Sequence, residues 1–98
     1  MSRRRLDGEA VKAALGGLDG WSLDEGGAAI RKKFVFADFS AAFGFMARAA
    51  LAAERLDHHP EWTNVWNRVE VRLTTHSAKG LTALDFELAR AMEQIAAR

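Results

Sequence analysis

The sequence contains no cysteine. Disulfide bonds, thiolate metal sites and a cysteine nucleophile are therefore excluded, and the composition is typical of a protein in a reducing compartment such as the cytoplasm. Excess charge of one sign is also missing, because 14 Lys and Arg residues against 13 Asp and Glu residues leave a formal net charge of +1. So small a net charge creates no strong field for a polyanion, and we expect no nucleic-acid partner.

Long apolar runs are absent too. The most apolar region, residues 39–53, is shorter than the about 20 residues that a helix needs to span a bilayer, and it contains Arg48. The basic start, Arg3, Arg4 and Arg5, is not followed by the apolar stretch of a signal peptide. We therefore expect a cytoplasmic protein that does not associate with a membrane.

What remains is the composition of a folded domain. Hydrophobic residues make up 49% of the chain, charged residues make up 28%, and there is a single proline. A disordered or low-complexity chain would have far fewer apolar residues. The length of 98 residues leaves room for one domain only. We expect residues 1–98 to form a single domain with a packed core.

The first part of the chain predicts a helix followed by a β-hairpin. Residues 7–18 carry apolar side chains at helical intervals and are followed by glycines. Residues 21–23 and 28–36 are predicted strands, joined by a turn at residues 24–27. Side chains alternate in the second strand, so that one face is expected to be buried and the other to face solvent.

A long helix is predicted from Asp38 to about Asp57, where Pro60 disfavours helical geometry in the residue before it. One apolar stripe is expected to face the sheet, and it consists of Phe39, Phe43, Met46, Ala50 and Ala53. Phe45 and several alanines widen the apolar surface beyond this stripe. The wider surface indicates a second contact, such as another subunit, or simply the high helix propensity of alanine.

The last part of the chain predicts a second hairpin and a final helix. The strands are residues 61–67 and 69–75, with a turn near Asn67 and Arg68. Thr82 is followed three residues later by Asp85, which resembles a capping box with Asp in place of Glu or Gln. The buried face of the helix is expected to be Leu84, Leu88, Ala91 and Ile95.

Hairpins that alternate with helices predict the α+β class. We expect a two-layer sandwich in which a four-stranded antiparallel sheet carries helices packed on one face, in the order α-β-β-α-β-β-α.

The three histidines lie close together in the sequence, at His58, His59 and His76. Neighbouring side chains of an extended segment point in opposite directions, so His58 and His59 need different partners. The second hairpin should bring His76 back toward this corner, and Pro60 would fix the local backbone.

Three interpretations of this cluster are open. Surface histidines at loop edges are common, and imidazole is also the commonest metal ligand. Two adjacent histidines are sterically awkward for one ion, however, and no carboxylate or cysteine stands at a familiar ligand spacing. Proton transfer near neutral pH suits imidazole better.

The residues around the histidines resemble a known family. Glu54, followed by Asp57-His58-His59-Pro60 and then by Trp66, His76 and Asp85, is similar to the signature of the pterin-4a-carbinolamine dehydratases. Nearly the whole chain shares in the resemblance. It implies the same α+β fold, preceded by an additional amino-terminal helix. It also implies a lyase that dehydrates 4a-hydroxytetrahydropterin to quinonoid dihydropterin without a metal or organic cofactor.

The resemblance places His58, His59 and His76 around the pterin. Proton transfer is assigned mainly to His58 and His76, while His59 holds the ring and shares in the acid role. The expected substrate-binding residues are Asp57, Pro60, Trp66, Thr75, Ser77 and Asp85.

Several of these assignments have alternatives. Trp66 either stacks on the pterin or belongs to the core. Asp85 caps the final helix and is expected to orient the loop of His76. Asp57 or Glu54 could fix an imidazole tautomer or accept a hydrogen bond from the pterin, although Glu54 could equally be a solvated helix residue.

The family resemblance also suggests partners. It implies a link to an aromatic amino acid hydroxylase, and a homodimer or a tetramer formed through the alanine-rich helix. The alternative function is a non-enzymatic protein-partner module on the same fold, such as a transcriptional cofactor or an assembly factor. A small metal-binding protein is a third hypothesis.

Overall fold

The computed structural model describes residues 2–24 and 26–97. Its elements are α1 (Gly8–Leu15), β1 (Ser22–Leu23), β2 (Ile30–Val35), α2 (Phe39–Leu56), β3 (Glu61–Val65), β4 (Arg68–Leu73), the short 3₁₀ helix η1 (His76–Ala78) and α3 (Ala83–Ala96). The predicted α-β-β-α-β-β-α order is confirmed, and η1 is the one addition. The predicted turn at residues 24–27 includes Glu25, which lies outside the described residues.

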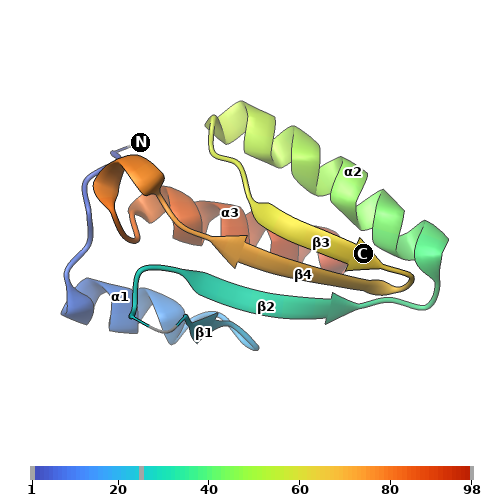
Figure 1. Ribbon diagram of the computed structural model, residues 1–98, viewed down its shortest axis with the longest axis horizontal. Coiled ribbons are helices and arrows are strands. Elements are labelled where there is room, and N and C mark those ends of the chain that lie inside the picture. Colours follow the sequence, from blue (N-terminus) through green and yellow to red (C-terminus); the bar gives the residue numbers. More distant parts are fainter. Residues whose placement is uncertain (1, 25, 98) are drawn as a thin grey trace.

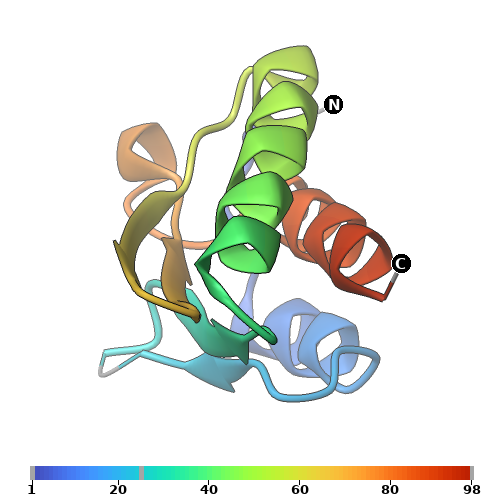
Figure 2. The same cartoon turned by 90° about the vertical axis from the view of Figure 1, so that its right-hand side faces the viewer.

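The four strands form one antiparallel sheet in the order β1-β2-β4-β3. Figure 1 shows α3 running behind this sheet and α2 above β3, and Figure 2 shows all three helices on the same side of the sheet. The predicted two-layer sandwich is therefore confirmed. The other face of the sheet is left uncovered within the described chain.

Side-chain alternation separates the two faces of the sheet. In β2, Ile30 and Phe34 are buried while Arg31 and Lys33 are exposed, as predicted. Because Arg31 pairs with Arg72 of β4 in the register, two cations face each other on the open side. This arrangement requires a nearby anion, since like charges directly opposite one another are destabilising.

Helix α2 begins and ends as predicted, but only part of the predicted stripe faces the core: Ala53 is buried and Met46 is partly buried, as expected. Its buried residues are Ala42, Phe45, Ala49, Ala52 and Ala53. Phe39 and Phe43, which were expected to face the sheet, are 51% and 58% exposed. Several stripes of this helix are apolar, so periodicity did not distinguish between them, and the stripe that packs against α3 and β4 consists of Phe45 and four alanines.

The second hairpin is shorter than predicted. Strand β3 ends at Val65 and β4 begins at Arg68, so the turn lies at Trp66 and Asn67. Trp66 adopts a left-handed φ of 50°. The Asn64 side chain donates to the carbonyl oxygens of Trp66 and Arg68 and fixes this turn.

Helix α3 completes the core. Thr82 and Asp85 form the predicted capping box at its start. Leu84 and Leu88 are buried as expected, whereas Ile95 is only partly buried against the core. No helix within the described residues is long and apolar enough to cross a membrane.

Candidate active site

A small cavity of about 240 Å³ opens where the end of α2 meets the end of β4. It is lined by Arg3, Asp57, His58, His59, Thr74, Thr75, His76 and Ser77. All three histidines therefore border one space, as the hairpin geometry predicted. Two larger cavities exist elsewhere in the molecule, but neither is lined by a histidine.

The end of α2 sets the direction of the first two histidines. Asp57 adopts a left-handed conformation with φ 51°, and the His58 amide donates to the carbonyl of Ala53. The chain then runs extended into β3. His58 consequently points inward and is 5% exposed, while His59 points outward.

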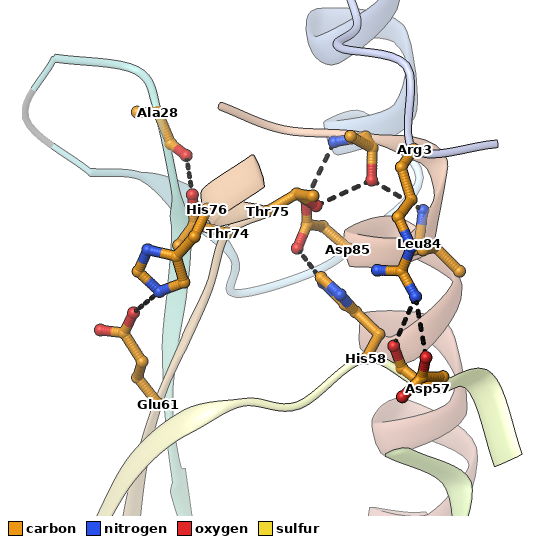
Figure 3. A network of polar contacts seen from close by, with 11 residues as sticks. Arg3, Ala28, Asp57, His58, Glu61, Thr74, Thr75, His76, Leu84 and Asp85 are labelled. Carbon is orange, nitrogen blue, oxygen red and sulfur yellow. Dashed lines mark hydrogen bonds and ion pairs between the residues drawn. The ribbon is translucent and has the colours of Figure 1, made fainter. Parts of the chain in front are cut away.

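His58 is held by a buried carboxylate. Its Nε2 lies 2.5 Å from Oδ1 of Asp85, which is 0% exposed (Figure 3). The other Asp85 oxygen, Oδ2, accepts from the Thr75 hydroxyl at 2.8 Å and from the Thr82 amide at 2.9 Å. Because a carboxylate can only accept, the proton of this contact lies on His58 Nε2 when Asp85 is ionised, and the neutral ring then has Nδ1 unprotonated.

His59 and His76 are paired with carboxylates at the surface. His59 Nε2 lies 2.7 Å from Oε1 of Glu54, which belongs to the last turn of α2. His76 Nε2 lies 2.8 Å from Oε2 of Glu61, the first residue of β3. The His76 ring is 81% exposed, and Figure 3 shows it on the opposite side of Thr75 from the His58–Asp85 pair.

An arginine from the start of the chain closes one side of the cavity. Arg3 Nη2 donates to the Asp57 carbonyl oxygen at 2.7 Å and lies 3.4 Å from its Oδ2 (Figure 3). The amide of Leu6 donates to the carbonyl of Leu81 and ties this segment to the loop before α3. Asp57 therefore interacts with Arg3 in this structure, and the imidazole-fixing role considered for it belongs to Glu54.

The structure brings most of the predicted site residues together. Asp57, Thr75 and Ser77 line the cavity beside the histidines, while Pro60 adjoins it in the sequence without lining it. Asp85 lies beneath the cavity, where it contacts His58 and also accepts from the hydroxyl of Thr75, the residue before His76, in keeping with the expected role in orienting the His76 loop. The contact with His58 was not predicted, because it depends on the start of α3 lying under the end of α2.

Trp66 is not part of this site. It lies in the β3–β4 turn, whereas the histidines lie at the opposite end of these strands, and its side chain is 61% exposed. Neither stacking in this cavity nor a place in the core is consistent with that position. Spacing in the sequence did not distinguish a residue at the end of a strand from one in the turn.

Glu61, Arg72 and Arg3 were missed at the sequence level. The register places Glu61 opposite Arg72, and this pairing could have been read only from the exact strand boundaries. Asp24 accepts from Arg72 Nε at 2.7 Å and raises the pKa of that guanidinium above its ordinary value. Arg72 is therefore charged throughout the range in which an imidazole titrates.

The arrangement can move protons at two or more points around a small ligand. Each imidazole is within hydrogen-bond distance of a carboxylate, which is how histidine general acids and bases are commonly oriented. Among the described residues, no group of three or more His, Asp or Glu side chains is placed to hold a metal ion. The three imidazole–carboxylate contacts favour acid–base chemistry on an organic ligand.

The chain is similar in sequence to known proteins. The family model for pterin 4 alpha carbinolamine dehydratase matches residues 4–95. A relative from Chelativorans sp. (strain BNC1) is 58% identical over 98 residues, which is 100% of both chains. A relative from Bradyrhizobium diazoefficiens is 63% identical over 92 residues, covering 94% of this chain and 92% of the relative. Both are named, provisionally, as pterin-4-alpha-carbinolamine dehydratases.

A solved structure gives the same result for the fold. The crystal structure of a transcriptional coactivator/pterin dehydratase from Brucella melitensis superposes with a TM-score of 0.92 at 56% sequence identity. The match covers 95% of this chain and 99% of that chain.

Proposed function

The chain belongs to the pterin-4a-carbinolamine dehydratase family, and we propose that it dehydrates 4a-hydroxytetrahydropterin by histidine general acid–base catalysis. The observation that carries this proposal is the convergence of His58, His59 and His76 on one cavity, each ring beside its own carboxylate. The product would be quinonoid dihydropterin, so the enzyme would support recycling of the tetrahydropterin used by an aromatic amino acid hydroxylase.

The reaction needs one proton delivered and one removed. The 4a-hydroxyl takes up a proton and leaves as water, the N5–H bond gives up its proton, and the electrons of that bond form the C4a=N5 double bond. Each assisted transfer is typically worth about 10² to 10⁴ in rate. We assign these transfers mainly to His58 and His76, with His59 holding the ring and sharing in the acid role.

Further side chains of the cavity suit a polar heterocycle. The Thr75 hydroxyl is committed to Asp85, whereas Ser77 is exposed at the rim and can reach a ligand. Asp57 stands at the same rim beside Arg3. These groups support a neutral, hydrogen-bonding substrate, and the proposed chemistry requires neither a metal nor an organic cofactor.

The direct test is the decay of 4a-hydroxytetrahydropterin absorbance in the presence of the purified protein. We expect the wild-type protein to accelerate the decay, and metal chelation to leave the acceleration unchanged. A wild-type protein that does not accelerate the decay would overturn the proposal. Loss of the acceleration with chelator, and its return with metal, would replace the cofactor-free mechanism by a metal-dependent one.

We also propose a homo-oligomer, a dimer or a tetramer. Helix α2 exposes Phe39, Phe43 and Leu51, the last of them 70% exposed, which is unusual for large apolar side chains on one helix. Light scattering at micromolar concentration should therefore show an assembly larger than a monomer, and Phe43→Ser should shift it toward smaller species. Ser40→Ala, at an exposed polar position of α2, is the matched control. A monomeric wild-type protein would contradict this proposal.

The same exposed face supports the alternative function, a protein-partner module. The solved relative from Brucella melitensis is titled a coactivator as well as a dehydratase. The absorbance assay separates the two functions, because a partner module without activity would leave the carbinolamine to decay at its spontaneous rate.

We propose the cytoplasm as the location of the protein, in keeping with the absence of cysteine.

A further inference from the structure

We propose that Glu61 is a positioning residue for His76, and that Arg72 holds Glu61 in place for this purpose. The proposal rests on the proposed function, because it assigns a role in the same dehydration. Glu61 and Arg72 lie on the open face of the sheet, and neither lines the cavity that the three histidines border. The proposal is based on a continuous series of hydrogen-bond contacts that runs from His76 through Glu61 and Arg72 to Asp24 in the β1–β2 turn.

The series begins with the imidazole. His76 Nε2 lies 2.8 Å from Glu61 Oε2, and the other oxygen of Glu61, Oε1, accepts from Arg72 Nη1 at 3.1 Å. Both carboxylate oxygens of Glu61 are therefore engaged. Such a carboxylate has less freedom to rotate than one with a single partner, and the imidazole bound to it is restrained as well.

Arg72 is itself held from the other side. Its Nε donates to Asp24 Oδ2 at 2.7 Å, and Asp24 Oδ1 lies 3.5 Å from Arg31 Nη1. Asp24 thereby supplies the anion that the facing pair Arg31 and Arg72 requires. The Asp24 side chain is only 19% exposed, so the network is anchored at its inner end.

The network has a chemical consequence for His76. An ionised Glu61 can only accept a hydrogen bond, so the proton of the contact lies on Nε2. In the neutral ring Nδ1 is then the unprotonated nitrogen, available as a base. A carboxylate that orients a catalytic imidazole in this manner recurs in enzymes that use histidine as a general base.

An isolated exposed ion pair would not justify this inference. Pairs of this kind contribute about 0–1 kcal/mol and often nothing measurable, and networks with well-defined geometry are the exception. Here one guanidinium joins two carboxylates through different nitrogens, which a lysine ammonium could not do with the same geometry. The contacts that link His76 of η1 to Glu61 of β3, Arg72 of β4 and Asp24 of the β1–β2 turn therefore favour a restraint on His76.

Two measurements test the proposal. First, three-bond couplings across χ1 of His76 report whether its ring occupies one rotamer. We expect one rotamer in the wild-type protein and averaging among rotamers in Glu61→Ala, while the control Glu70→Gln, an exposed carboxylate on the same sheet face, keeps the wild-type couplings. Unchanged couplings in Glu61→Ala would overturn the proposal, and they can be measured whether or not the protein is active.

Second, steady-state kinetics separate positioning from binding. We expect Glu61→Ala to lower kcat on the order of tenfold and to change KM by less than about twofold, because Glu61 does not line the cavity. Glu61→Gln, which retains an acceptor, should restore part of kcat, and Arg72→Lys should show a smaller loss than Glu61→Ala. A kcat in Glu61→Ala equal to that of the wild type would overturn the proposal. Absence of activity in the wild-type protein would instead overturn the proposed function, and the couplings would then decide the inference alone.

Discussion

His58 and His76 border the same cavity, but their surroundings differ in nearly every respect. His58 is buried and bonded to Asp85, which also caps α3 and accepts from Thr75. His76 is exposed and bonded to Glu61, which belongs to a network on the open sheet face. The inner pair is therefore part of the fold, whereas the outer pair can be changed without disturbing the core.

This difference separates stability from activity. Burial makes every unpaired polar atom costly, so the inner pair cannot lose a member without destabilising the protein. Solvent can replace the partners of the outer pair, so a change there should be visible in the reaction and hardly at all in folding. We therefore expect variants of the His58–Asp85 pair to lower the stability of the protein, and variants of the His76–Glu61 pair to lower its activity while the stability stays nearly unchanged.

The largest effect on stability is expected for Asp85→Ala. This change removes the Asp85 half of the capping box and leaves the His58 ring, the Thr75 hydroxyl and the Thr82 amide without this buried acceptor, which should cost about 3 kcal/mol or more of unfolding free energy. Urea unfolding followed by circular dichroism measures it. Gln94→Ala, an exposed position on the same helix, should remain within about 0.5 kcal/mol of the wild type.

The companion variant Asp85→Asn retains an acceptor for the Thr82 amide but removes the charge beside His58. It should unfold at a urea concentration between those of Asp85→Ala and the wild type. If Asp85→Ala were as stable as Gln94→Ala, the inner pair would not be the structural element that its burial indicates.

His76→Ala should give the reverse pattern. The ring is 81% exposed, so its removal should change the unfolding free energy by less than about 0.5 kcal/mol. Loss of a proton-transfer group should lower kcat/KM by about 10² to 10⁴ in the carbinolamine assay. A His76→Ala protein with full activity would remove His76 from the proposed mechanism, and one that fails to fold would contradict the contrast between the two sides.

Much of the fold could be predicted because local signals agreed with one another. The Thr82 and Asp85 capping box, the alternation in β2 and the end of α2 before Pro60 each depend on neighbours in the sequence. The convergence of the histidines followed from hairpin geometry. These features need no knowledge of how the helices pack.

The errors concern contacts between distant segments. The buried face of α2 depends on which stripe fits α3 and β4, and Phe45 with four alanines is buried where Phe39 and Phe43 were expected. The partner of Asp85 depends on α3 passing beneath the end of α2, and that of His76 depends on the β3–β4 register. Tertiary packing decides such pairings, and periodicity alone carries no information about it.

The smallest effect is expected for Glu54→Gln, at the third histidine. The Glu54 side chain is 75% exposed and its Oε1 lies 2.7 Å from His59 Nε2. Among residues 2–24 and 26–97, no arginine contacts Glu54 in the way that Arg72 contacts Glu61. An exposed pair without a network should contribute little, and Gln keeps both the helix propensity and an acceptor. We expect unfolding within about 0.5 kcal/mol of the wild type and a loss in kcat/KM of less than about tenfold.

Glu54→Gln tests a histidine–carboxylate pair that has no further network, unlike the pair of His76 and Glu61. If Glu54→Gln lowers kcat/KM as strongly as His76→Ala, then Glu54 acts on the substrate itself and is more than a partner of His59. If the loss is small and mainly in KM, His59 holds the ligand, as the division of roles among the three histidines requires. Measuring KM and kcat separately for Glu54→Gln, with Arg55→Gln at the neighbouring exposed position as the control, decides between the two.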